Sequence, residues 1–172
     1  LVTGQFAAAM TRGIRSAGSS ATVKHFAANN QETERHNVNS VVSERALREI
    51  YLKGFEIAVK EGNANSIMTS YNQNNGRPAA DDYDLCTTYG SVNGLWTAGN
   101  YDLVTRILHD EWGFTGFTMT DWWAKMNDVV NGGEADRRYT SFMVRAQNDL
   151  YMVVNNNGAA INAAGDDTVE AL

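Results

Sequence analysis

Several residue types are scarce in this chain, and each shortage excludes a class of protein. The 172 residues include one cysteine, Cys86, which can form neither an internal disulfide nor a zinc site built from paired cysteines. There is one proline, Pro78, beside 15 glycines, so the chain is neither collagen-like nor a disordered sequence rich in proline and glycine. No apolar run approaches the roughly 18 residues that a membrane-spanning helix needs, so a soluble chain without a membrane partner is expected.

Basic residues are also few. Lysine and arginine total 14 against 20 aspartates and glutamates, which gives a formal net charge of −6. The basic residues are scattered rather than gathered in one stripe, and a protein that binds a phosphate backbone needs such a stripe. Nucleic acid is therefore not an expected partner. Hydrophobic residues make up 43% of the chain, enough to bury one core of ordinary size.

Strand and helix signals alternate along the chain. Short runs typical of strands occur at 21–26, 66–70, 117–120 and 150–154. Apolar residues at three- and four-residue steps predict helices between them, and neighbouring parallel strands need such helices as crossovers. The pattern therefore predicts an α/β fold with four parallel strands.

Three helices are predicted most clearly. One lies near the N-terminus, where Phe6, Met10 and Ile14 recur at helical spacing. A second occupies 43–62, with a serine at the N-cap position and a glycine at its end. A third is expected at about 101–112.

An internal repeat follows the second predicted strand. Eight residues between Tyr71 and Thr87 reappear, 18 positions later, between Tyr89 and Thr105. One duplication is too short for a solenoid, which needs three or more stacked units. The repeat therefore indicates a long, locally duplicated loop, and which copy contacts a ligand is left open.

Polar side chains follow the strands at the points where each strand ends. Lys24 and His25 lie at or near the end of the first strand, Tyr71 just past the second, Asp121 just past the third, and residues 155–157 just past the fourth. In parallel α/β folds, reactive residues collect at these carboxyl ends. A cation, an imidazole, a phenol and a carboxylate at one rim suit a polyhydroxylated ligand, and the carboxylate is free to act as nucleophile or base.

Two aromatic residues beside this aspartate narrow the class of ligand. Trp122 and Trp123 offer flat apolar faces, which match the C–H faces of sugar rings. Carbohydrate is therefore the expected ligand.

These residues also have ordinary interpretations. An aspartate at a strand end is often a helix N-cap or a turn residue, and one of Lys24 and His25 would usually be a surface side chain. Glu32, Glu34 and Arg35 suit a local ion-pair cluster better than a binding site.

Three motifs in order carry a resemblance to a known family. They occupy residues 24–32, which begin with Lys24-His25, residues 67–72, and residues 112–122, which end in Asp121-Trp122. Together they resemble the N-terminal barrel domain of glycoside hydrolase family three, the β-glucosidase group. The resemblance implies a partial (β/α)₈ barrel, with residues 1–172 as a single partial domain that corresponds to about the C-terminal half of the barrel.

The resemblance also implies an activity and a set of site residues. The expected function is that of a retaining, exo-acting β-glycosidase on a β-linked glucoside or oligosaccharide, with Asp121 as the catalytic nucleophile that forms a covalent glycosyl-enzyme intermediate. It implies neither a metal nor an organic cofactor. Five side chains would bind the substrate: Lys24, His25, Met68, Tyr71 and Trp122.

The chain departs from the β-glucosidase pattern in one respect that leaves alternatives open. The acid/base glutamate of this branch comes from a second domain, and nothing in these residues matches it, so the chain alone is expected to be inactive or very weak. One alternative is a non-catalytic module that self-associates, recruits the remainder of a longer polypeptide or binds sugar weakly. The other is a β-N-acetylglucosaminidase-like enzyme with a Glu34/His36 dyad. Sugar preference and cellular location are left open.

Overall fold

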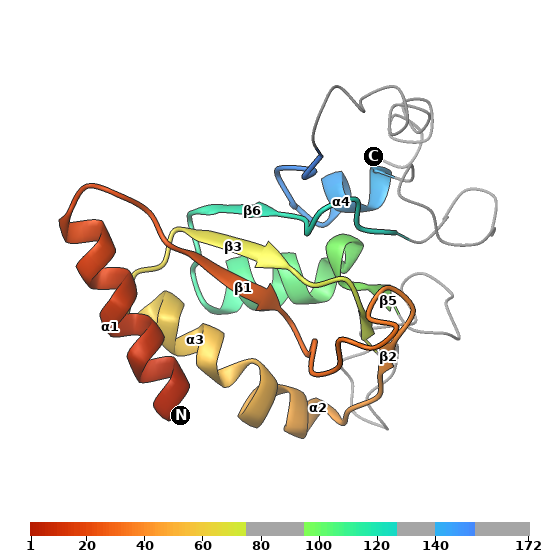
Figure 1. Ribbon diagram of the computed structural model, residues 1–172, viewed down its shortest axis with the longest axis horizontal. Coiled ribbons are helices and arrows are strands. Elements are labelled where there is room, and N and C mark those ends of the chain that lie inside the picture. The colour runs from red at the N-terminus through yellow and green to blue at the C-terminus, as the bar shows by residue number, and fades with distance from the viewer. Residues whose placement is uncertain (75–94, 127–139, 154–172) are drawn as a thin grey trace.

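A parallel sheet is the framework of the structure (Figure 1). The computed structural model describes residues 1–74, 95–126 and 140–153. Its main sheet has the order β1-β3-β6, formed by β1 (Thr22–Phe26), β3 (Ser66–Thr69) and β6 (Phe117–Met119). Both pairs of neighbours are parallel. Three of the four predicted strands are therefore confirmed.

In the described residues the fourth predicted strand appears as an isolated bridge rather than as a strand. Met119 and Leu150 form an isolated parallel bridge. The Thr120 N–H donates to the Leu150 carbonyl oxygen at 2.8 Å, so the chain at 150 runs beside β6. The order of strands is thus β1-β3-β6 followed by this segment, which is a partial α/β barrel.

Helices supply the crossovers between these strands. The predicted helix at 43–62 is present in three consecutive parts, and the Ser43 hydroxyl caps it by accepting from the Ala46 N–H at 3.2 Å. The segment at 101–112 is also helical. The helices of the described ranges are α1 (Val2–Ser16), α2 (Glu44–Ala46), η1 (Leu47–Tyr51), α3 (Lys53–Lys60), η3 (Thr97–Gly99), η4 (Asp102–Glu111) and α4 (Ser141–Arg145). None of them is long and apolar enough to span a bilayer.

α1 packs against α3 through small residues. The buried side of α1 carries Gly4, Ala8 and Thr11. A Cβ atom on Gly4 would lie 3.0 Å from the Gly54 Cα, so the two backbones approach too closely for larger side chains. Phe6 and Met10, which mark this helix in the sequence, are instead 68% and 64% exposed. The apolar stripe of α1 therefore faces away from α3.

The hydrophobic core lies between the sheet and the helices. The Phe26 ring at the end of β1 meets Phe55 at 5.2 Å and Trp112 at 6.0 Å between centroids, both edge-on. The largest fully buried aliphatic residues of this core are Leu52, Ile67, Leu103, Ile107 and Leu108. This packing fixes the strands whose carboxyl ends form the rim.

A second, small sheet holds the loops at that rim. It has the order β2-β4-β5, from β2 (Asn39–Ser40), β4 (Gln73–Asn74) and β5 (Leu95–Trp96). Ser70 and Asn72 both donate to the Ala27 carbonyl oxygen, at 3.0 and 3.2 Å, which ties the loop after β3 to the end of β1. The sequence did not predict this sheet. Residues 75–94, with much of the internal repeat, and 155–157 lie outside the described residues.

Candidate active site

Asp121 lies just beyond the end of β6 and is the most buried of the predicted site residues. It is 5% exposed. The Trp122 N–H donates to its Oδ1 at 2.7 Å, and the His25 Nε2 lies 3.3 Å from its Oδ2. One carboxylate oxygen is thus held by the backbone, and the other faces a side chain at the end of β1. The sequence expectation that these two residues meet at one rim is confirmed.

His25 faces Asp121 as a neutral imidazole at pH 7. Partial burial lowers the pKa of His25, and the neighbouring Lys24 charge lowers it further, while Asp121 raises it. A neutral ring still donates one N–H, so the contact with Asp121 is a hydrogen bond rather than a full ion pair when that proton is on Nε2.

Tyr71 completes the set of groups around the carboxylate. It lies just past β3, is 6% exposed, and its hydroxyl is close enough to the side chain of Asp121 for the carboxylate to affect its pKa. Burial, followed by the negative charge of Asp121, raises the pKa of Tyr71 to about 12. The phenol therefore stays protonated at physiological pH and is able to donate to Asp121.

The loop after β1 brings two further residues, Arg35 and His36, against Tyr71, and from the sequence these were considered only for an ion-pair cluster and for a dyad with Glu34. The Arg35 guanidinium lies 4.8 Å from the centre of the Tyr71 ring, and the His36 and Tyr71 ring centroids are 4.1 Å apart. Arg35 also forms the expected ion pair with Glu32, at 2.8 Å. The position of these two residues could have indicated that they lie near the site, because their loop follows a strand that ends at the rim.

Glu34 and His36 do not form the dyad considered from the sequence. The Glu34 carboxylate accepts from the Asn37 side chain at 3.1 Å. His36 lies against Tyr71 instead.

The remaining predicted residues are placed less centrally. Lys24 is exposed and lines a hollow of about 440 Å³ beside α1, and its side chain makes no hydrogen bond or ion pair with another described residue. Met68 is buried in β3, in register with Met119 of β6. Trp122 is half-buried, and its ring lies 5.9 Å from that of Trp123. His25, Tyr71, Asp121 and Trp122 are thus brought together, and Lys24 is directed elsewhere.

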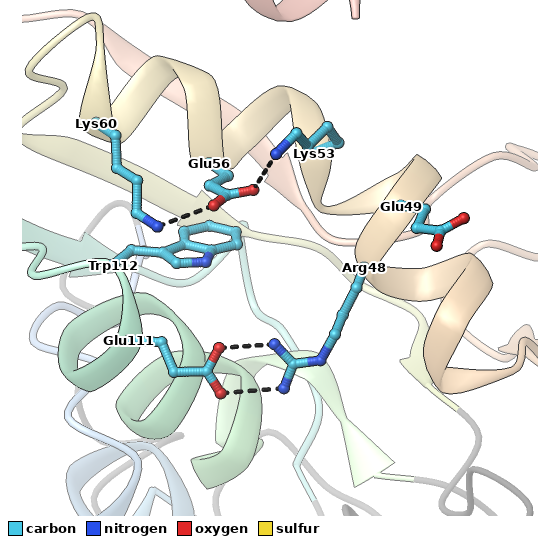
Figure 2. Close-up of a pocket in the computed structure, with 7 residues that line it drawn as sticks. All are labelled: Arg48, Glu49, Lys53, Glu56, Lys60, Glu111 and Trp112. Atoms are coloured by element: carbon cyan, nitrogen blue, oxygen red, sulfur yellow. Dashed lines mark hydrogen bonds and ion pairs between the residues drawn. The ribbon is translucent and has the colours of Figure 1, made fainter.

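A second hollow, of about 390 Å³, lies between the η1–α3 segment and the end of η4 (Figure 2). Arg48 of η1 makes a two-bonded ion pair with Glu111 of η4, at 2.6 and 3.0 Å. The Glu56 carboxylate accepts from Lys53 at 2.8 Å and from Lys60 at 2.9 Å. Because the basic side chains of this hollow are all paired with carboxylates of its own wall, it joins helices rather than presenting free charge to a ligand.

Metal chemistry finds no support in the described parts of the chain. Within residues 1–74, 95–126 and 140–153, no group of three or more histidine, cysteine, aspartate or glutamate side chains could hold a metal ion. What the rim offers is an ionisable carboxylate with a phenol donor, an imidazole and an indole around it, which suits nucleophilic chemistry on a hydroxylated substrate.

Comparisons with known proteins indicate the family of the chain. The model of the glycosyl hydrolase family 3 N-terminal domain matches residues 1–171. A β-glucosidase of Ruminococcus albus is 53% identical over 170 residues, which are 99% of this chain and 15% of that protein. The chain therefore spans about one seventh of the length of this relative.

Solved structures give the same result. A β-glucosidase from Paenibacillus barengoltzii is 64% identical, with a TM-score of 0.79 over 98% of this chain and 16% of that one. β-Glucosidase 3B from Thermotoga neapolitana, in complex with glucose, is 37% identical, with a TM-score of 0.72 over 98% of this chain and 20% of that one. With a family match over nearly all its residues and the partial barrel described above, the chain belongs to glycosyl hydrolase family 3.

Proposed function

We propose that this chain carries the nucleophile side of the active site of a retaining, exo-acting β-glycosidase that acts on β-linked glucosides. The observation that carries the proposal is the buried carboxylate of Asp121 at the rim, held by the Trp122 N–H and approached by His25 and Tyr71. The relatives named β-glucosidase support the same substrate class.

In this proposal Asp121 attacks the anomeric carbon. A bond forms between a carboxylate oxygen and that carbon as the glycosidic C–O bond breaks, and an acid/base group protonates the departing oxygen. Water then attacks the anomeric carbon of the ester, the acid/base group takes its proton, and the bond to Asp121 breaks. Asp121 leaves as a carboxylate, and the sugar is released with its anomeric configuration retained. The family resemblance assigns the acid/base role to a glutamate outside these residues.

The surrounding side chains have distinct proposed roles. Tyr71, protonated because of its raised pKa, holds the carboxylate by donating to it. His25 binds sugar hydroxyls, Met68 lines the same subsite, and Trp122 forms a wall near the leaving group. The sugar-binding role that the resemblance implies for Lys24 requires its side chain to turn from the hollow beside α1 toward the rim. Hydroxyl contacts that strengthen in the transition state lower the barrier.

Labelling with 2,4-dinitrophenyl 2-deoxy-2-fluoro-β-D-glucoside tests the proposal. Dinitrophenolate leaves without acid assistance and the fluorine slows hydrolysis of the ester, so the chain can be tested without its acid/base partner. Peptide mapping by mass spectrometry is expected to place the label on Asp121. Asp110→Asn, which removes an exposed carboxylate of η4, is the control and should label normally. A label on another carboxylate contradicts the assignment.

A second candidate is a non-catalytic module that associates with a second copy of itself. It is favoured by the exposed apolar stripe of α1, where Val2, Phe6 and Met10 are 69%, 68% and 64% exposed. β1 is also at the edge of the sheet formed by the described strands. Sedimentation should then give a dimer or larger species that Phe6→Lys dissociates, while a monomer at all concentrations, together with turnover of the activated glucoside, excludes this candidate.

A further inference from the structure

His36 is in contact with the site without touching Asp121 in any described interaction. Its ring centroid lies 4.1 Å from that of Tyr71, with an angle of 48° between the planes. His36 itself is largely exposed, whereas Tyr71 is buried. The imidazole thus covers part of the phenol ring of Tyr71.

The orientation of that phenol matters for the carboxylate. Tyr71 reaches Asp121 through one hydroxyl, and a tyrosine side chain has two torsions that decide where its hydroxyl lies. A ring packed by a neighbour keeps one orientation, while an unpacked ring samples several. Contacts on the ring therefore control how much of the time the donor faces Asp121.

The loop that carries His36 is anchored on both sides of it. Arg35 lies 4.8 Å from the centre of the Tyr71 ring and is paired with Glu32 at 2.8 Å. Asn37 accepts from Lys125, beyond β6, at 3.2 Å. The loop after β1 is thus connected to the loop after β6, with His36 between the two anchors.

The charges around His36 favour its neutral form. Partial desolvation lowers the pKa of His36, Arg35 and Lys125 lower it further, and Asp121 and Glu32 raise it. A neutral imidazole packs on a phenol at little electrostatic cost, whereas an imidazolium would be a third cation beside Arg35 and Lys125.

From this geometry we infer that His36 is a positioning residue, which holds the Tyr71 ring so that its hydroxyl donates to Asp121. The inference rests on the proposed function, because it assigns His36 a part in the same site. Its effect on the reaction is indirect, through Tyr71, and it needs no contact with the sugar.

The first test measures Tyr71 directly and does not depend on activity. In the chain labelled with 3-fluorotyrosine, ¹⁹F NMR follows the hydroxyl titration, with the Tyr71 signal assigned from Tyr71→Phe. His36→Ala is expected to lower the pKa of the labelled Tyr71 toward that of free 3-fluorotyrosine, because the ring gains solvent and loses its fixed position beside Asp121. His36→Phe should retain most of the shift. Thr33→Ala, in the same loop and exposed, is the control and should change nothing.

The second test is a double-mutant cycle on the labelling reaction. His36→Ala is expected to slow labelling of Asp121 about tenfold at saturating reagent, with little change in reagent affinity. His36→Phe should restore most of the rate. In a Tyr71→Phe background, which lacks the hydroxyl, His36→Ala should have little further effect.

The outcomes separate the two hypotheses. An unchanged Tyr71 titration in His36→Ala overturns the positioning role, and so does an additive effect of the two substitutions. A loss of labelling rate in Glu34→Gln as large as in His36→Ala would show that the path of the loop, held by the bond from Asn37 to Glu34, sets the rate rather than the His36 ring, and would also overturn it. Labelling of a carboxylate other than Asp121 refutes the proposed function, while the ¹⁹F titration still decides the role of His36.

Discussion

At the scale of single residues, Asp121 combines burial with partners that an asparagine can only partly replace. In Asp121→Asn the side-chain oxygen can still accept from the Trp122 N–H, so we expect an unchanged fold and melting temperature. The amide is not a nucleophile, so turnover of 2,4-dinitrophenyl β-D-glucoside should fall by at least about 10³-fold. Retention of the rate at equal Tm would show that the nucleophile lies elsewhere.

Two histidines of the site link its protonation to stability. The pKa values of His25 and His36 are lowered in the folded chain, chiefly by burial, from an ordinary value of 6.5. Just below pH 6.5 the unfolded chain therefore binds more protons than the folded chain, and stability is lost as pH falls through this range. We expect Tm to fall between pH 7 and pH 5, and to fall less in the variant His25→Gln/His36→Phe. An equal fall in both would place the acid sensitivity in other groups.

Residues of the rim differ in how far the sequence could predict them. Asp121 and Tyr71 follow strands directly, so the parallel topology alone brings them to one edge. Arg35 and His36 lie in an irregular loop whose path depends on local bonds, such as Asn37 to Glu34, and on a positive φ of 56° at Glu34. Periodicity carries no information about such a path, so their contact with Tyr71 was not predicted.

At the scale of elements, helix packing shows why a correct helix prediction can leave its buried face undetermined. The bulky residues of α1 form one stripe, yet the face against α3 is made of Gly4, Ala8 and Thr11. A periodicity argument assigns the core to the largest side chains, whereas two closely packed backbones need the smallest. The buried face of α1 is decided by its contact with α3, and the sequence pattern of α1 contains no information about that contact.

Two glycine substitutions test this packing. A Cβ at Gly62 would lie 2.7 Å from the Ala8 Cα and 2.5 Å from the Ala58 carbonyl oxygen. Gly62→Ala is therefore expected to lower the free energy of unfolding by about 1–3 kcal/mol, measured by urea denaturation. Gly13→Ala, on α1 with nothing within 4 Å of the added carbon, is the matched control and should raise it by about 0.5–1 kcal/mol. Similar effects of the two would contradict the close approach of α1 and α3.

At the scale of the whole molecule, the rim joins parts of the chain that are far apart in sequence. His25 lies near the end of β1, Tyr71 and Asp121 follow β3 and β6, and the bond from the Asn72 side chain to the Ala27 carbonyl oxygen connects the loops after β1 and β3. A sugar bound at the rim would contact all three segments, and none of these contacts exists in the unfolded chain. Binding should therefore stabilise the whole fold rather than one loop.

Thermal unfolding with added sugar measures this linkage. At glucose concentrations ten times Kd the gain is about 1.4 kcal/mol, which corresponds to a rise in Tm of about 3–6 °C for a chain of this size. Sorbitol at equal concentration corrects for the general stabilisation by excluded polyols, because it lacks the pyranose ring. His25→Ala should remove the glucose-specific part of the rise, since His25 is proposed to bind a sugar hydroxyl. Equal effects of glucose and sorbitol would mean that the described rim does not bind glucose, even if Asp121 were labelled by the more reactive glucoside.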